Sequence, residues 1–233
     1  MIPATCDIEI SNGYIYKKCK SEISTESIEN QIKEFSYKGE KRVKDYAVER
    51  AMLPPFAYSF YSYIFENQAI PSPEEFTEKY LSQEYFTKES DDEYRVSYKN
   101  RNVVLNKDGL IARILRAYPS LLRDVHFYYM ADESNLFEET KYSFNDDYSN
   151  GIDIQVMYKG QWYDVALLQN TRRSMYFKNE KKRRHGDLDL DLIYMEIDRK
   201  DSKACGDFNL FTKKHINKLF ETVKERAESS LAF

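Results

Sequence analysis

The stretch GIDIQVMYKGQWYDVALLQ, residues 151–169, decides the fold because it contains two β-rich runs joined by Lys159 and Gly160. A glycine turn between two such runs is typical of a β-hairpin. The aliphatic run VALL at 165–168 and the run LIYMEI at 192–197 are both typical of central strands that are buried on both faces. The sequence therefore predicts a hairpin and a further strand in one sheet.

Helices and a further strand are predicted around this hairpin. Asp108 is expected to cap a helix that continues past Pro119 to about residue 130. The residues 137–144 have strand character and end in the turn-rich NDDYSNG. Residues 171–185 are helix-like with Thr171 as N-cap, and 210–230 form an amphipathic helix with Leu210, Ile216, Leu219, Phe220 and Val223 on its apolar side. We therefore expect an α+β or α/β fold with a mixed central sheet in αβββαβ order, flanked by helices.

The first hundred residues indicate a helical region. Helices are expected at about 24–36 and 41–53, followed by a break at Pro54-Pro55 and an aromatic helix FAYSFYSYIFENQ. This aromatic run is interpreted as core, with base stacking as the alternative. Ser72 before Pro73 predicts another helix at 73–84. The polar segment 87–102 is a loop or a short hairpin, so we divide the chain into a helical region, 1–100, and an α/β domain, 101–233.

The composition excludes several classes of protein. No apolar run reaches the roughly 18 to 20 residues of a spanning helix, and the N-terminus lacks a signal-peptide pattern, so we expect a cytoplasmic protein without a membrane partner. The three cysteines, Cys6, Cys19 and Cys205, have no zinc-ligand spacing and are expected to be reduced. The net charge of −4 means that nucleic-acid binding would need a local basic patch.

The αβββαβ order, with Asp153 opening the second strand in GIDIQ, resembles the PD-(D/E)XK nuclease superfamily over about residues 108–200. The resemblance implies that Asp153 binds a Mg²⁺ or Mn²⁺ ion. It also implies an acid and, two residues later, a lysine on the third strand. These groups would bind the metal and orient the attacking water. The helix before the first strand often supplies a Glu in this family; here it offers Arg113, Arg116, Arg123 and Asp124.

The third strand departs from the family pattern in either of two registers. Gln169 takes the place of the second acid in one register, as in some transposon-end nucleases, and Thr171 then stands where the lysine belongs. Lys178 and Lys182 on the following helix are the candidates for a displaced lysine. In the other register the second metal ligand is Asp164, with Ala166 at the lysine position. Asp153 and Asp164 also have a purely structural interpretation, as turn and strand residues.

A basic island follows this strand in QNTRRSMYFKNEKKRRH, residues 169–185. Phosphate contacts are predicted for its remaining basic residues, which are Arg172, Arg173, Lys181, Arg183 and Arg184. The structural alternative is the solvated face of a helix. Asp187, Asp189 and Asp191 lack the spacing of a calcium-binding loop and are interpreted as solvating the next strand.

Two functional hypotheses follow from these residues. The first is a Mg²⁺- or Mn²⁺-dependent endonuclease that hydrolyses phosphodiester bonds, with DNA favoured as substrate. The second is a catalytically inactive protein of the same fold, such as a phage or mobile-element factor, that binds nucleic acid or a protein partner. The incomplete acid-x-lysine pattern on the third strand favours the second hypothesis.

Overall fold

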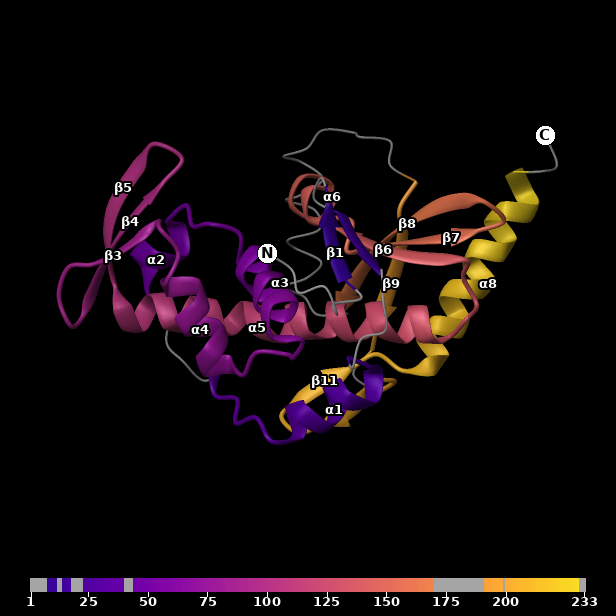
Figure 1. Ribbon diagram of the computed structural model, residues 1–233, viewed down its shortest axis with the longest axis horizontal. Coiled ribbons are helices and arrows are strands. Elements are labelled where there is room, and N and C mark those ends of the chain that lie inside the picture. The colour runs from indigo at the N-terminus through magenta and orange to yellow at the C-terminus, as the bar shows by residue number, and fades with distance from the viewer. Residues whose placement is uncertain are drawn as a thin grey trace.

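A computed structural model of the chain describes residues 8–11, 14–17, 23–39, 44–169, 191–198 and 200–230. Its longest element is α5 (Lys107–Glu133), which forms the axis of the molecule in Figure 1. The N-cap of the helix lies two residues before the predicted cap, Asp108. Asn106 is the N-cap, and its side-chain oxygen accepts a hydrogen bond of 3.0 Å from the backbone N–H of Gly109. Asp108 lies instead in the first turn, and the helix continues through Pro119 as predicted.

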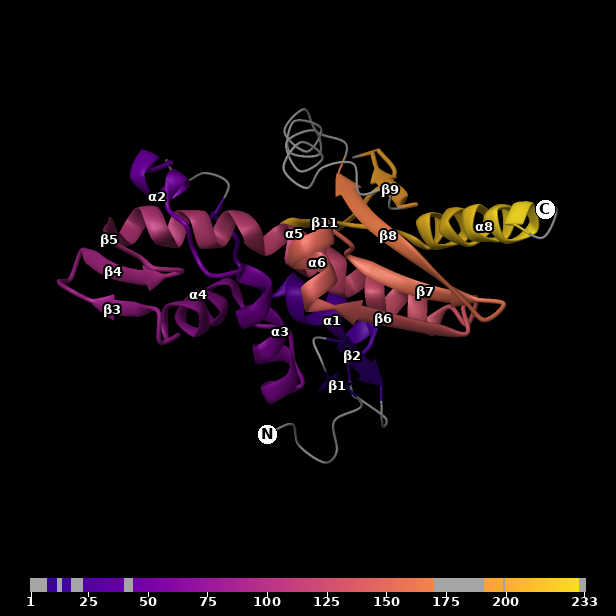
Figure 2. The ribbon, with the colours of Figure 1, turned by 90° about the horizontal axis from the view of Figure 1, so that it is seen from above.

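A mixed six-stranded sheet lies over the C-terminal half of α5 (Figures 1 and 2). Neighbouring strands are antiparallel except for the last two, which are parallel. In spatial order the strands are β1 (Ile8–Ser11), β2 (Tyr14–Lys17), β6 (Glu139–Ser143), β7 (Ile154–Tyr158), β8 (Gln161–Gln169) and β9 (Ile193–Ile197). The α+β class and the mixed central sheet are therefore confirmed. The helix predicted between β8 and β9 lies outside the described residues.

The β7–β8 hairpin forms as predicted. Lys159 and Gly160 both have positive φ, 51° and 72°, which matches the right-handed twist of the two strands that they join. Ile154 pairs with Val165. Alternate residues such as Ile154 and Val156 are fully buried in the main core, whereas Gln155 lies on the opposite face. This register fixes which side chains of β7 and β8 face α5.

The N-terminal helices pack on α5. The structure confirms helices at three predicted places, α1 (Thr25–Lys33), α3 (Phe56–Asn67) and α4 (Pro73–Leu81). Ser72 caps α4 as predicted and forms a reciprocal capping box with Glu75. Phe60 of the aromatic helix is fully buried against Phe76 and Tyr118, so its core interpretation is confirmed. One core cluster extends from Ile23 to Ala227, and the division of the chain near residue 100 stays a prediction.

A separate small sheet projects from the N-terminal end of α5 (Figure 1). We call this sheet and the short helix beside it the wing; it consists of α2 (Tyr46–Arg50), β3 (Phe86–Lys88), β4 (Glu93–Tyr98) and β5 (Arg101–Asn106). Its own core contains Val48, Val96 and Leu105, which pack on Leu110 of α5. The hairpin alternative for residues 87–102 is therefore confirmed, and α2 is much shorter than predicted.

Several elements differ from the sequence predictions. The residues NDDYSNG, predicted as a turn, form the helix α6 (Phe144–Asn150) up to its cap Gly151, because the Ser143 hydroxyl accepts a hydrogen bond from the N–H of Asp146. Strand β9 is buried on one face only, with Tyr194 and Glu196 exposed, so the prediction of burial on both faces was wrong. The hairpins β1–β2 and β10–β11 were not predicted; β10 spans Lys203–Cys205 and β11 spans Phe208–Leu210.

The C-terminal helix α8 (Lys213–Ser230) covers the sheet beside β9 (Figure 1). Ile216, Leu219 and Val223 are buried as predicted, whereas Leu210 belongs to β11. Asp191 forms an exposed ion pair of 2.6 Å with Arg226 of α8, which agrees with a solvating role. None of the helices described above is both long and apolar enough to cross a lipid bilayer.

Candidate functional site

Asp153 lies directly before β7 and is held by two hydrogen bonds to β8. Its backbone N–H donates to the carbonyl oxygen of Val165 at 2.9 Å, and its Oδ2 accepts from the backbone N–H of Leu167 at 2.5 Å. The hairpin register, extended by one residue, places Asp153 opposite Ala166. The carboxylate is half-buried and therefore has a fixed position at the edge where β7 begins.

Two buried tyrosines lie close to this edge. The rings of Tyr61 from α3 and Tyr142 from β6 are stacked, with centroids 4.0 Å apart and an angle of 25° between their planes. The Tyr142 hydroxyl donates a hydrogen bond of 2.8 Å to Oδ2 of Asp147 in α6. This bond orients a second half-buried carboxylate beside the tyrosine pair.

The electrostatics of the tyrosines show that three carboxylates share this neighbourhood. The pKa of Tyr61 is raised well above its usual value, first by burial and then by the negative charges of Asp124, Asp147 and Asp153. Burial, followed by Asp147 and then Asp153, likewise raises the pKa of Tyr142. Both phenols therefore stay protonated at physiological pH. We call these five residues the tyrosine–carboxylate cluster: Tyr61, Asp124, Tyr142, Asp147 and Asp153.

The cluster joins elements that are distant in sequence. Asp124 comes from α5, Asp153 precedes β7, and Asp147 comes from the short α6. An acid from the helix before the first strand is what the resemblance to the nuclease superfamily implies, with Asp124 in place of the usual Glu. Sequence reasoning missed Tyr61, Tyr142 and Asp147 as members of the site, because the segment around Asp147 was interpreted as a turn.

Asp164, the alternative second acid, lies in the middle of β8 and pairs with Gln155 of β7. Its Oδ1 accepts a hydrogen bond of 2.5 Å from Gln155 Nε2. The structure thus places Asp164 in a cross-strand pair, whereas Asp124 and Asp153 each act electrostatically on Tyr61.

The other candidate residues lie at or beyond the end of β8. Gln169 is the last residue of β8, and its backbone pairs with that of Ile197. The side chain of Gln169 lies outside the described part of the structure. The basic island lies wholly outside the described residues; these predicted positions are Arg172, Arg173, Lys178, Lys181, Lys182, Arg183 and Arg184. In sequence this island follows the strand that holds Asp153 in place.

The donor set fits one class of metal ion. In the described part of the chain, no three His, Cys, Asp or Glu side chains lie close enough to form a metal site by themselves. A closed protein cage for zinc or calcium is therefore not formed by these residues. Mg²⁺ is commonly held by one or two carboxylates together with water and substrate phosphates. Half-buried Asp124 and Asp153, in one electrostatic neighbourhood, fit that kind of open site.

The two described arginines at the start of α5 have structural partners. Arg113 donates hydrogen bonds to the backbone carbonyls of Val48 and Ala51, and Arg116 forms an ion pair with Glu49. Both arginines therefore make contacts within the protein. They attach α2 to α5.

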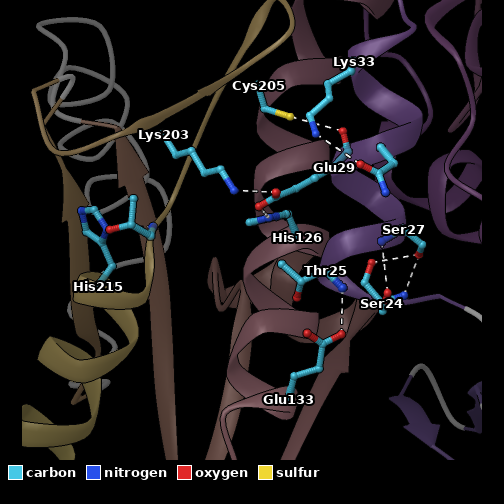
Figure 3. A network of polar contacts seen from close by, with 12 residues as sticks. Ser24, Thr25, Ser27, Glu29, Lys33, His126, Glu133, Lys203, Cys205 and His215 are labelled. Atoms are coloured by element: carbon cyan, nitrogen blue, oxygen red, sulfur yellow. Dashed lines mark hydrogen bonds and ion pairs between the residues drawn. The ribbon is translucent and has the colours of Figure 1, made fainter.

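A second polar network connects α1, α5 and β10 (Figure 3). Glu29 accepts a hydrogen bond from Lys203 Nζ at 2.5 Å, and its other oxygen lies 3.2 Å from Nε2 of the buried His126. The Cys205 thiol donates to the Glu29 carbonyl at 3.3 Å, so Cys205 is a buried free thiol, as expected. Burial lowers the pKa of His126 despite the carboxylate partner. The contacts of this network join α1 to α5 and to β10, which pack on it, so we interpret the network as structural.

Comparison of the chain with protein-family models, with curated proteins and with solved structures found no match. The function must therefore be inferred from the residues of the tyrosine–carboxylate cluster and from the topology around them.

Proposed function

We propose that the chain is a metal-dependent endonuclease that hydrolyses phosphodiester bonds in DNA. The observation that carries this proposal is the fixed position of Asp153 directly before β7, where its Oδ2 accepts a hydrogen bond of 2.5 Å from the N–H of Leu167 in β8; half-buried Asp124 of α5 is the second candidate acid. One acid from the helix and one from the second strand is the combination that a PD-(D/E)XK nuclease would need.

The topology supports the same proposal. After α5 the sheet contains three antiparallel strands, β6, β7 and β8, followed by β9 parallel to β8. The helix α6 is an insertion between the first two of these strands. The seven basic residues of the island follow β8 in the sequence, next to the strand end where a nuclease would bind a phosphate backbone.

Asp124 and Asp153 would hold Mg²⁺ or Mn²⁺, with Gln169 as a further candidate ligand. Such an ion, when bound, polarises the phosphate and lowers the pKa of a bound water. The protein contributes fixed positions: the N–H of Leu167 orients Asp153, and Tyr142 orients Asp147. In the proposed site, Lys178 or Lys182 would orient the attacking water. The stacked rings of Tyr61 and Tyr142 in the cluster are buried.

A second candidate function is a catalytically inactive nuclease fold that binds nucleic acid or a protein. The observation that favours it is the composition of β8 near Asp153. Ala166 lies opposite Asp153 in the extended register, and the next residue on the same face is Leu168. Neither can bind a metal or move a proton, so the third strand contributes no described catalytic group at this point.

A cleavage assay separates the two functions. Purified protein is incubated with single-stranded, duplex and branched DNA in Mg²⁺, Mn²⁺ or EDTA. The proposal expects cleavage that needs the metal and that falls by at least about 100-fold in Asp153→Asn, since a metal contributes several kcal/mol and each 1.36 kcal/mol is tenfold. DNA binding without cleavage in every metal would favour the inactive fold.

The matched control is Asp164→Asn. It removes a carboxylate from the same hairpin, outside the cluster, and an Asn oxygen can still accept the bond from Gln155. We expect its cleavage rate to stay within about threefold of the unsubstituted protein. Loss of activity in Asp164→Asn as well as in Asp153→Asn would instead assign the second metal ligand to the other register.

A further inference from the structure

The β4–β5 turn of the wing presents basic side chains to solvent. Lys99 and Asn100 form a two-residue turn with positive φ values of 47° and 60°, and Tyr98 pairs with Arg101 on either side of it. Strand β3 pairs with β4 as far as Val96, and Tyr85 before it accepts a further backbone hydrogen bond of 2.9 Å from Ser97. Only the end of the β4–β5 hairpin, from Tyr98 to Arg101, is therefore two-stranded, and it carries exposed Lys99 and Arg101.

Charge is separated along the wing. The acidic residues of this sheet lie at the opposite end from Lys99 and Arg101, and they are Glu89, Asp91, Asp92 and Glu93. Two of them form ion pairs with basic neighbours: Lys88 with Asp91 at 2.7 Å and Arg95 with Glu89 at 2.6 Å. These pairs offset charge around the β3–β4 turn, so the β4–β5 turn is the positive end of the wing.

The helix α2 packs on Leu105 and Leu110, at the α5 end of β5, and carries a second exposed basic group of the wing. Tyr46 is 69% exposed, and the guanidinium carbon of the exposed Arg50 lies 4.1 Å from the centre of its ring. Lys44 before the helix is exposed as well. The acids of α2 are engaged within the protein, because Asp45 accepts from the N–H of Val48 and Glu49 pairs with Arg116. An outward Arg–Tyr stack beside lysines suits phosphate and base contacts.

The wing is held rigidly on α5. Helix α2 approaches α5 so closely that a Cβ on Gly109 would lie 2.6 Å from the Cβ of Asp45, and only glycine fits there. Arg113 donates to the carbonyl oxygen of Ala51 at 2.9 Å, which ties the end of α2 to the same helix. A surface with a fixed geometry loses little conformational entropy when it binds a ligand.

We propose that the wing is a separate binding surface for duplex DNA. Its charge complements the phosphate backbone, and a two-stranded β-ribbon fits the major groove of B-form DNA but not the deep, narrow groove of A-form RNA. The turn projects to the same side of α5 as α6, which carries Asp147 (Figure 1). One duplex can therefore lie along the molecule and contact both regions.

The spacing along α5 gives the expected footprint. Leu110 packs in the wing and Asp124 belongs to the tyrosine–carboxylate cluster, and their separation of 14 positions along α5 (124 − 110) corresponds to about 21 Å of helix. At 3.4 Å per base pair this is about 6 base pairs of DNA. This footprint rests on the proposed function, whereas binding of DNA by the wing does not.

The test is a binding measurement by fluorescence anisotropy with a labelled duplex of about 30 base pairs, in EDTA so that cleavage plays no part. Lys99→Gln with Arg101→Gln, and separately Lys44→Gln with Arg50→Gln, are compared with Lys213→Gln with Lys214→Gln. The last pair removes the same charge from exposed residues of α8, at the other end of the molecule. We expect each wing pair to weaken binding by at least about tenfold and to reduce the salt slope by about 1.8, because each phosphate contact contributes about 0.9. Thermal unfolding verifies that each variant is folded.

Several outcomes would overturn the assignment of the wing. The first is that the unsubstituted protein does not bind the duplex. The second is that the α8 pair of substitutions weakens DNA binding as much as the wing pairs do. The third is that the protein binds duplex RNA as tightly as duplex DNA and that the wing variants weaken both equally. Concentration-dependent dimerisation that Val103→Arg abolishes, without DNA binding, would assign the exposed edge of β5 to a second copy of the chain. Because binding is measured in EDTA and does not depend on cleavage, failure of the wing and failure of the proposed nuclease are distinguished.

Discussion

The carboxylate of Asp153 accepts a 2.5 Å hydrogen bond from the backbone N–H of Leu167, across the hairpin from its own strand. This contact gives Asp153 a structural role in addition to the proposed chemical one. Asp153→Asn keeps a side-chain acceptor and should leave the free energy of unfolding within about 0.5 kcal/mol. Asp153→Ala leaves the N–H of the buried Leu167 without this partner and should cost about 1–3 kcal/mol. Urea denaturation of both variants checks this difference, and equal stability of the two would show that the hydrogen bond contributes nothing.

The hydroxyl of Tyr142 is expected to orient Asp147 rather than to act as an acid, since its pKa is raised. Tyr142→Phe should therefore lower stability by about 1 kcal/mol, the usual net contribution of such a bond, and leave the pH profile of cleavage unchanged. Chemical denaturation and a pH–rate profile measure the two quantities. Tyr163→Phe, on the same face of the sheet outside the cluster, is the control. A shifted profile in Tyr142→Phe would contradict the orienting role.

Acid should destabilise the protein through His126. Burial lowers its pKa below the ordinary value of 6.5, so the unfolded chain takes up a proton first as the pH falls. The stabilising contribution of neutral His126 is thus fully present above about pH 6.5. It is lost as the pH falls through the lower pKa that His126 has in the folded protein. Burial alone would raise the pKa of Glu29, but hydrogen bonds from Lys203 and His126 lower it below the ordinary value of 4.5. Glu29 therefore adds a further loss of stability as the pH falls below 4.5. Charged groups around His126 are Glu29, Lys203 and Glu133.

Melting temperatures from about pH 8 to about pH 5 measure this effect. His126→Phe should flatten the decrease below pH 6.5. His215 also has a pKa lowered by burial, so it contributes with the same sign, and His215→Phe should remove only its own share. An unchanged pH dependence in His126→Phe would mean that the ring is already protonated in the folded protein.

The attachment of α2 to α5 is expected to depend on Arg113. Arg113→Met removes the hydrogen bonds to the carbonyls of Val48 and Ala51 and should cost about 1–3 kcal/mol. Hydrogen exchange should rise in residues 45–51 and not in α4. Arg101→Met, an exposed substitution in the same wing, is the control and should leave exchange unchanged. Equal exchange in Arg113→Met and the unsubstituted protein would show that hydrophobic packing alone holds α2.

Local signals in the sequence were sufficient for much of the fold. Ser72 with Pro73, and Lys159 with Gly160, determine backbone geometry within four residues, and the structure confirms both. Burial of β9 on both faces was predicted wrongly. The run is apolar enough for two buried faces, but Tyr194 is 44% exposed, which only the tertiary arrangement determines. The β1–β2 hairpin was missed although Asn12-Gly13, a strong hairpin signal, stands between its two strands in the sequence.

The candidate site was only partly predictable. Asp153 stood out because it precedes a strand, but the contributions of Tyr61 and Asp147 arise from packing between α3, β6 and α6. Such contacts between distant segments leave no periodic pattern in one sequence. Asp164 and Asp153 looked equivalent in the sequence, and only the register of β7 and β8 shows that Gln155 pairs with Asp164.

The most direct test of the central claim is a double-substitution cycle of the cleavage rate at Asp124 and Asp153. If both carboxylates serve one metal-dependent site, Asp124→Asn and Asp153→Asn should each reduce the rate by at least about 100-fold, and the double variant should be little slower than either. Independent, multiplicative effects, or full activity in Asp124→Asn, would contradict a shared site.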